Sequence, residues 1–118
     1  MRAVIEGIVQ LIGLIFDKIK IYSRASVVRV DGGLSRSTLF LRLLATALGT
    51  IVERQRDVET TARGVAALLK VFKGDWSLND VIKGVHVNVE LRVEPGEERL
   101  SLNRDIVKRI IEGMRCRA

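Results

Sequence analysis

Aliphatic residues recur at helical spacing through the first twenty positions of the chain. Val4, Ile8, Leu11, Ile15 and Ile19 lie three or four residues apart, and other apolar residues between them widen the stripe. Because a helix turns about every 3.6 residues, this spacing predicts a single, mostly buried helix with a broad apolar face.

A short β-branched run and a glycine pair come next. Residues 27–30 are Val-Val-Arg-Val and lead directly into Asp31, Gly32 and Gly33. β-Branched residues favour strands, and glycine favours tight turns. The pattern therefore predicts a buried strand that ends in a glycine turn.

The following two elements complete a βαβ unit. Apolar spacing predicts a helix over residues 39–48, with Ser35 or Ser37 as its N-terminal cap and Gly49 as its C-terminal cap. Residues 50–53 predict a second strand. A crossover of this kind is right-handed and joins parallel strands.

Two more helices are predicted in the second half of the chain. One covers residues 62–72 and is capped within residues 57–60. The other is short and covers residues 77–82, where Ser77 and Asp80 stand at capping-box spacing.

A strand and a last helix end the pattern. Apolar and polar residues alternate over residues 85–93, which predicts a half-exposed strand that Pro95 and Gly96 terminate. Residues 106–114 predict an amphipathic helix. No repeat or linker divides residues 1–118, so we expect one α/β domain with a short, mainly parallel sheet and helices packed on it.

The most apolar window, residues 3–19, does not have the pattern of a membrane span. Glu6, Asp17 and Lys18 interrupt it, and it is shorter than the ~20 apolar residues that a spanning helix needs. It also lacks the basic flank and the cleavage site of a signal peptide. We therefore expect no membrane partner and a cytoplasmic location.

Composition excludes several kinds of site. The 118 residues are 47% hydrophobic and 29% charged with a single proline, which is typical of a packed globular segment. Cys116 is the only cysteine, so one chain forms neither a disulfide framework nor a cysteine-based zinc site. His86 is the only histidine, which argues against histidine-rich metal sites and histidine-based triads. We predict no metal ligands.

The formal net charge is +6. A basic surface attracts phosphate groups, in nucleotides or in nucleic acid. Aromatic residues make up only 4% of the chain and do not alternate with basic ones, so nucleic acid is not expected as a partner. Few Asn and Gln beside many Arg, Val and Ile are typical of thermophilic proteins.

Residues 31–37, Asp-Gly-Gly-Leu-Ser-Arg-Ser, are the best candidate for a ligand-binding segment. A glycine pair lets the backbone approach a ligand where a Cβ would clash. The helix after it offers unpaired N–H groups and the positive end of its dipole. Glycines after strands also serve turns alone, so a purely structural role is the alternative. The segment has neither the Walker A spacing nor G-x-G-x-x-G.

Val-Asp-Gly-Gly-Leu-Ser-Arg-Ser at 30–37 and Leu-Gly-Thr-Ile-Val-Glu-Arg at 48–54 are two of several motifs along nearly the whole chain. In order and spacing, these motifs resemble the C-terminal domain of FGGY-family carbohydrate kinases of the glycerol kinase type. Those kinases have a strand ending in Asp-Gly-Gly, a helix ending in Leu-Gly and a strand of Thr-x-Val-Glu-Arg type. The matching segments are Arg-Ala-Val-Ile-Glu-Gly-Ile at 2–8, Val-Asp-Gly-Gly-Leu-Ser-Arg-Ser at 30–37, Leu-Arg-Leu-Leu-Ala at 41–45, Leu-Gly-Thr-Ile-Val-Glu-Arg at 48–54, Glu-Thr-Thr-Ala-Arg-Gly-Val-Ala at 59–66 and Arg-Val-Glu-Pro at 92–95.

The resemblance implies an actin-like, ribonuclease-H-like fold in two lobes, with ATP, Mg²⁺ and a polyol or sugar in the cleft between them. Residues 1–118 would form a single partial domain of the C-terminal lobe. Gly32, Gly33 and Ser37 would line the nucleotide pocket, with Ser37 where the family has an asparagine. Other departures from the family pattern are Thr46 for Asp, Gln55 for Pro and Arg63 for Leu.

The resemblance also implies that the reacting groups lie elsewhere. The family's phosphate loops, substrate residues and catalytic aspartate precede the point that matches Met1, and Asp31 borders the nucleotide site without being the base. No catalytic residue is therefore predicted, and whether this chain is itself an enzyme stays open. It is interpreted as a fragment or truncated gene product, as one piece of a split kinase, or as a stand-alone lobe that binds nucleotide or protein.

Surfaces that face the rest of the kinase in that family would meet water here. Apolar patches and open sheet edges promote association. We therefore expect one of two arrangements. The chain forms a homo-oligomer with the first helix in its interface, or the missing N-terminal kinase portion buries these surfaces.

Overall fold

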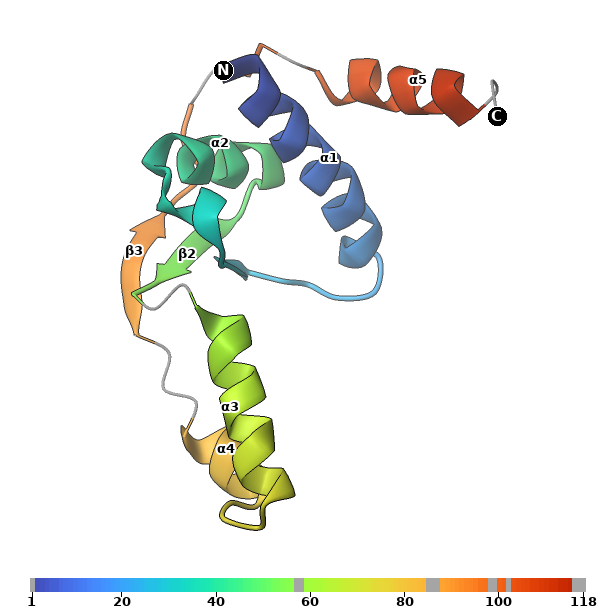
Figure 1. Cartoon of the computed structure of the whole chain (residues 1–118). Helices are drawn as coiled ribbons and strands as arrows, with labels where there is room; N and C mark the ends of the chain where they lie inside the picture. The colour runs from blue at the N-terminus through green and yellow to red at the C-terminus, as the bar shows by residue number, and fades with distance from the viewer. Residues whose placement is uncertain (1, 57–58, 85–87, 98–99, 102, 116–118) are drawn as a thin grey trace.

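The computed structural model describes residues 2–56, 59–84, 88–97, 100–101 and 103–115 (Figure 1). His86 and Cys116 lie outside the described residues, as does part of the predicted strand 85–93. The helices and strands follow one another in the order that the hydrophobic pattern predicts. In chain order the elements are α1 (Arg2–Lys20), β1 (Val27–Val30), the 3₁₀ turn η1 (Gly33–Arg36), α2 (Thr38–Leu48), β2 (Ile51–Gln55), α3 (Thr60–Phe72), α4 (Leu78–Gly84), β3 (Val89–Val93) and α5 (Arg104–Arg115).

The strands form one sheet in the order β1-β2-β3. β1 and β2 are parallel, with Val28 opposite Val52, as the βαβ pattern predicts. β3 is antiparallel to β2, with Val93 opposite Val52. The α/β fold class is confirmed, and the sheet is mixed because β3 joins the free edge of β2 in the opposite direction.

α2 is the buried centre of the fold, between α1 and the sheet (Figure 1). Ser37 Oγ accepts a hydrogen bond from the N–H of Phe40 over 3.3 Å, which makes Ser37 rather than Ser35 its N-terminal cap. Gly49, with φ 60°, ends it as predicted. The core cluster consists of Val9, Phe16, Phe40, Leu41, Leu43, Leu44, Ala45, Leu48 and Val52. Its four leucines all belong to α2, and fully burying one leucine stabilises a fold by about 1.5–3 kcal/mol.

α1 buries a narrower face than its apolar stripe predicts. Its buried residues are Glu6, Val9, Gln10, Gly13 and Phe16. The apolar residues that stay 37–66% exposed are Val4, Ile8, Leu11, Ile15 and Ile19. The expectation of a mostly buried helix is therefore wrong, because α2 and α5 cover only part of its circumference. Among the helices described, none combines the length and hydropathy needed to cross a bilayer.

Arg104 anchors α5 to the body of the molecule. Its guanidinium donates hydrogen bonds to the carboxylate of Asp17 and to the carbonyl of Ala47. It also lies against Gly13 of α1, where an added Cβ would be 2.8 Å from the guanidinium. A Cβ at position 13 would therefore displace the flexible end of the Arg104 side chain.

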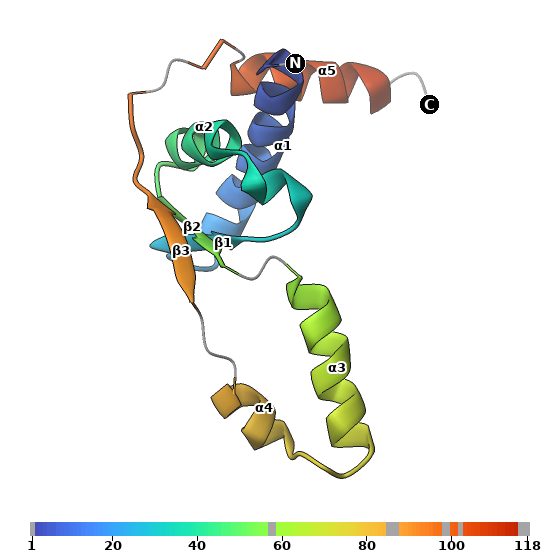
Figure 2. The same ribbon diagram turned by 60° about the vertical axis from the view of Figure 1, so that its left-hand side comes forward.

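α3 and α4 project from the body as an arm (Figure 2). Neither helix has a buried residue. The arm makes the molecule elongated, with extents of 51 × 36 × 29 Å and a radius of gyration of 17.4 Å. A compact chain of this length has a radius of gyration of about 13–14 Å. Apolar arm residues that are 54–90% exposed are Val65, Leu68, Leu69, Phe72, Leu78 and Ile82.

A reciprocal capping box begins α4, as predicted. Ser77 Oγ accepts a hydrogen bond from the N–H of Asp80 over 3.2 Å. Asp80 Oδ2 in turn accepts from the Ser77 hydroxyl at 2.7 Å and from the Ser77 N–H at 2.8 Å. These hydrogen bonds hold the pKa of Asp80 below its ordinary value of 3.8, because they stabilise the carboxylate.

The Ser77→Ala variant is expected to raise the pKa of Asp80 toward 3.8, because it removes the side-chain hydrogen bond. In the wild type, the carboxylate stabilises α4 fully above pH 3.8, and this contribution is lost as the pH falls through the lower native pKa. Carboxyl chemical shifts recorded against pH measure the change, with Ser23→Ala as a distant control. An Asp80 pKa that is the same in Ser77→Ala and wild type would contradict this account.

Candidate functional site

The glycine turn lies at the carboxyl end of β1 and leads into η1. Gly32 has φ 87° and ψ 176°, a conformation that is essentially confined to glycine. Its N–H donates a hydrogen bond to Asp31 Oδ1 over 2.6 Å. Gly33 has no positive φ, and an added Cβ at either glycine would meet nothing within 4 Å. The turn therefore presents backbone that a ligand can approach.

Two serines hold this turn in place. Ser35 is 1% exposed and donates both its hydroxyl, at 2.6 Å, and its N–H, at 3.1 Å, to the carbonyl of Gly32. Ser37 uses its side-chain oxygen to cap α2. Of the residues expected at a nucleotide pocket, Gly32 and Gly33 expose backbone, whereas the Ser37 oxygen already accepts a hydrogen bond.

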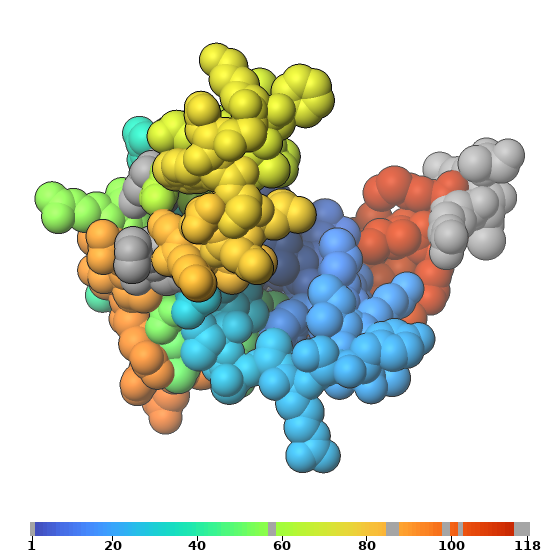
Figure 3. Space-filling view, turned by 90° about the horizontal axis from the view of Figure 1, so that it is seen from below, coloured from blue at the N-terminus to red at the C-terminus, as the bar shows by residue number. Residues whose placement is uncertain are grey.

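A cavity of about 710 Å³ reaches the start of the turn at Asp31. Its described lining does not include Gly32, Gly33 or Ser37. The cavity lies at the carboxyl ends of the parallel strands and is walled on its other side by the arm, which projects toward the viewer in Figure 3. Small-molecule sites have volumes of about 300–1,000 Å³, and open α/β sheets bind ligands at this edge. The lining residues are Arg29, Val30, Asp31, Gln55, Thr60, Arg63, Gly64, Ala66, Ala67, Leu68, Lys70, Trp76, Val81 and Gly84.

The wall of the cavity carries positive charge. Arg29, Arg63 and Lys70 line it, and Asp31 is the acidic group among the described lining residues. Asp31 Oδ2 accepts a hydrogen bond from the hydroxyl of Thr60, which joins the glycine turn to the first residue of α3. An excess of cationic side chains favours an anionic ligand.

Arg29 belongs to a charged ladder across the sheet. Glu53 is 5% exposed and lies opposite both Arg29 and Arg92. Its Oε2 is 3.2 Å from Arg29 Nε, and its Oε1 is 3.4 Å from Arg92 Nη1. The ladder compensates the buried carboxylate and fixes Arg29 at the edge of the cavity.

The described residues hold no group of three or more His, Cys, Asp or Glu that could bind a metal ion. The open backbone of the turn and the basic side chains of the cavity suit the organic and phosphate portions of a ligand.

Comparison with known proteins identifies the family. A model of the C-terminal domain of the FGGY family of carbohydrate kinases matches residues 1–71. The chain belongs to this family. The matched region contains α1, the βαβ unit with its glycine turn, and most of α3.

Curated relatives of this FGGY domain are glycerol kinases. That of Natranaerobius thermophilus is 35% identical over 85 residues, which is 70% of this chain and 17% of the relative. That of Rippkaea orientalis is 31% identical over 101 residues, or 84% of this chain and 20% of the relative. The chain thus spans about a fifth of the length of the relatives it matches.

A solved structure confirms the predicted fold. The crystal structure of Plasmodium falciparum glycerol kinase with ADP superimposes with a TM-score of 0.63 at 20% identity, over 97% of this chain and 22% of that one. The FGGY domain therefore has the fold of part of the actin-like C-terminal lobe.

The fold of the FGGY domain brings residues together that the sequence does not connect. Asp31 and Thr60 are 29 positions apart and share a hydrogen bond beside the cavity. Lys70 Nζ lies 4.1 Å from the centre of the Trp76 ring, and both side chains line the cavity. Sequence analysis proposed neither Lys70 nor Trp76 as a site residue. Motif spacing carries no signal for either contact, because each depends on how a helix meets its neighbours.

The two glycines are expected to respond differently to alanine. Gly32→Ala should destabilise the domain by about 1–3 kcal/mol, because its backbone conformation is strained for any residue with a Cβ. Gly33→Ala should leave stability unchanged or raise it by up to about 1 kcal/mol, because its Cβ meets open space and restricts the unfolded chain. Chemical denaturation measures both values. Equal losses in the two variants would contradict the geometry of the turn.

Proposed function

We propose that this chain is the C-terminal nucleotide-pocket part of a glycerol-kinase-like, ATP-dependent polyol kinase that works in the cytoplasm. Gly32 and Gly33 form the backbone edge against which the nucleotide lies, and Ser37 keeps the following helix in register. The groups that transfer the phosphoryl group belong to the N-terminal part of such a kinase.

The position of the glycine turn is the observation that carries this proposal. The turn is open to ligand on both glycines, lies at the carboxyl end of β1, and adjoins at Asp31 a cavity of about 710 Å³ whose lining includes Arg29, Arg63 and Lys70. A nucleotide combines a flat base, which needs close backbone approach, with phosphates, which need cations. The Plasmodium falciparum glycerol kinase was crystallised with ADP, which supports a nucleotide as the ligand class.

Phosphoryl transfer requires more than this site offers. It needs groups that hold the phosphates and their Mg²⁺, and a base positioned at the acceptor hydroxyl. The described residues hold no metal-binding group of acidic side chains. The chain therefore binds and orients the nucleotide, while Mg²⁺ would be held by the phosphates and by the rest of the kinase.

The surface of the chain supports a role as part of a larger body. It exposes 8808 Å², whereas a compact monomer of this mass exposes about 6,400 Å². The surplus includes the apolar stripe of α1 and the apolar residues of the arm. A covering N-terminal kinase portion would bury both faces.

Fragment complementation tests this function. The chain is mixed with the portion of the Natranaerobius thermophilus glycerol kinase that lies outside the matched region, and ATP-dependent phosphorylation of glycerol is measured. Activity is expected only in the mixture. The matched segment of the relative itself, mixed with the same portion, is the positive control. An active control with an inactive mixture would overturn the proposal, as would phosphorylation by the chain alone.

The Gly33→Val variant adds a specific test of the nucleotide edge. Its branched side chain should project from the turn into the space of the ligand and raise the KM for ATP of the complemented mixture about tenfold or more. The KM for glycerol should not change. Gly113→Ala in α5, where an added Cβ also meets open space, is the control. An unchanged KM for ATP in Gly33→Val would place the nucleotide elsewhere.

A second candidate function is a stand-alone interaction module. A groove of about 490 Å³ between α1 and α5 favours it, since its walls are largely apolar. The groove is lined by Leu11, Leu14, Ile15, Lys18, Ile19, Tyr22, Lys108, Ile111 and Glu112. In this case the partner that covers the groove is a second copy of the chain.

Ile15→Lys distinguishes this candidate, because Ile15 is 61% exposed and lines the groove. If α1 forms a homodimer interface, the wild type is dimeric at tens of micromolar and Ile15→Lys is monomeric. Leu68→Lys on the arm, at the same exposure of 61%, is the matched control and should stay dimeric. Light scattering after size exclusion measures the mass. A monomeric wild type rules this module out.

A further inference from the structure

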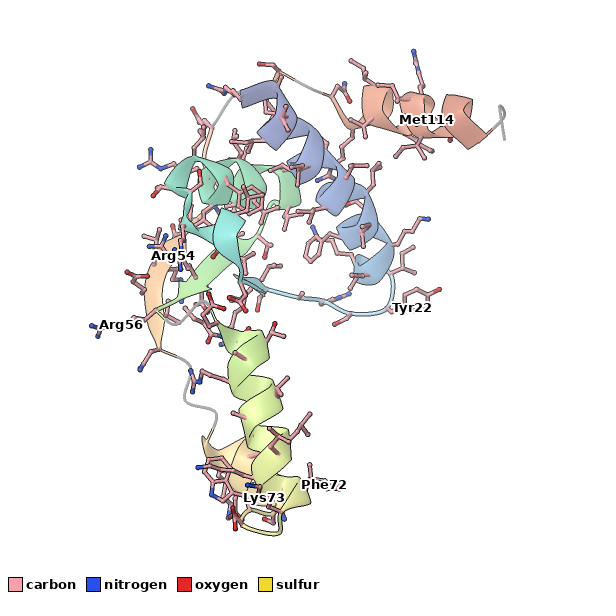
Figure 4. All side chains as sticks on the ribbon, viewed as in Figure 1. Tyr22, Arg54, Arg56, Phe72, Lys73 and Met114 are labelled. Atoms are coloured by element: carbon pink, nitrogen blue, oxygen red, sulfur yellow. The ribbon has the colours of Figure 1, made fainter. Side chains whose placement is uncertain are left out.

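Arg54 occupies an unusual place for a charged residue. It lies near the carboxyl end of β2, opposite Val30 of β1 and Leu91 of β3, both of which pack against the hydrophobic core. Its side chain is only 15% exposed. Figure 4 shows it between β3 and the turn that precedes α2. A guanidinium this enclosed requires several fixed partners.

Two of these partners are backbone carbonyls of η1. Arg54 Nη1 donates to the carbonyl of Ser35 over 3.2 Å and to the carbonyl of Arg36 over 3.3 Å. These carbonyls end the 3₁₀ turn that begins at Gly33. A cation at the carbonyl end of a helical turn is favourable, and the two contacts fix the position of η1 relative to β2.

The third partner is Glu90, which a β-bulge turns toward Arg54. The register pairs Arg54 with Leu91 but Gln55 with Val89, so Glu90 is the extra residue on β3. A bulge redirects a side chain away from the alternation of its strand. Glu90 Oε2 consequently lies 3.2 Å from Arg54 Nε, as an ion pair without hydrogen-bond geometry. The negative charge of the carboxylate therefore lies beside the guanidinium whose other end holds the turn.

We propose that Arg54, oriented by Glu90, is a positioning residue for the glycine turn and thereby sets the affinity of the nucleotide site. The effect on nucleotide rests on the proposed function, whereas the effect on the turn does not. Lysine cannot replace this arginine, because one ammonium cannot occupy the Nη1 and Nε positions together. The pair also links the nucleotide edge to β3.

The experiment compares wild-type chain with Arg54→Lys, Glu90→Gln and the double variant. Arg109→Lys is the control, because Arg109 is exposed on α5 and lines neither the turn nor the cavity. Amide hydrogen exchange is followed at Ser35 and Ser37, whose N–H groups close η1. ADP affinity is measured by calorimetric titration, and thermal melting reports global stability.

Arg54→Lys should speed exchange at both serines about tenfold and raise the Kd for ADP by a similar factor. Glu90→Gln should shift both quantities in the same direction by a smaller factor. The double variant should equal Arg54→Lys, because Glu90 acts through Arg54. Arg109→Lys should change neither quantity.

Faster exchange together with weaker ADP binding supports the proposal. Unchanged exchange at both serines overturns it, and so does faster exchange with unchanged ADP affinity. If wild-type chain takes up no ADP, the proposed nucleotide function fails, and the exchange data alone decide whether Arg54 positions the turn. If Arg54→Lys unfolds globally, the exchange rates and ADP affinity of Glu90→Gln, compared with those of the wild type, decide whether the pair positions the turn.

Discussion

Parallel strands cannot be joined by a tight turn, and this constraint organises the molecule. β1 and β2 pair in parallel from Val27 opposite Ile51 to Val30 opposite Arg54. The chain must therefore cross over from the end of β1 to the start of β2, and α2 makes this crossover. Because α2 is covered by α1 on one side and by the sheet on the other, its burial fixes both ends of the connection.

The site follows from the same constraint. The crossover begins where β1 ends, so the glycine turn lies at the carboxyl edge of the sheet. Gly32 reverses the backbone with a positive φ, and Ser35 returns two hydrogen bonds to its carbonyl. The turn is rigid as a result, yet its outer surface stays open. A rigid and open backbone edge is what a nucleotide-binding wall requires.

Local patterns predicted the elements that depend on a few neighbouring residues. Ser37, Gly49 and the Ser77–Asp80 capping box act where the sequence places them, because caps are satisfied within one helical turn. The spacing of the motifs also indicated the family. Glycine in the Asp-Gly-Gly segment predicted a tight turn, because glycine readily adopts the backbone conformation of Gly32.

Contacts between distant segments were beyond local patterns. The bulge at Glu90 and the reach of Arg54 to η1 depend on how β3 joins β2, which no alternation of apolar residues encodes. The sequence did not predict the exposure of Ile15. Apolar spacing shows which face of a helix is hydrophobic, but not what fraction of that face other elements bury.

The most direct test of the central claim is a titration of the isotopically labelled chain with ADP, followed by the amide resonances of its backbone. The account predicts chemical-shift changes at Gly32, Gly33 and the start of α3, with none on the outer face of α1. A spectrum that does not change at the glycine turn, or changes centred on the groove between α1 and α5, would contradict it.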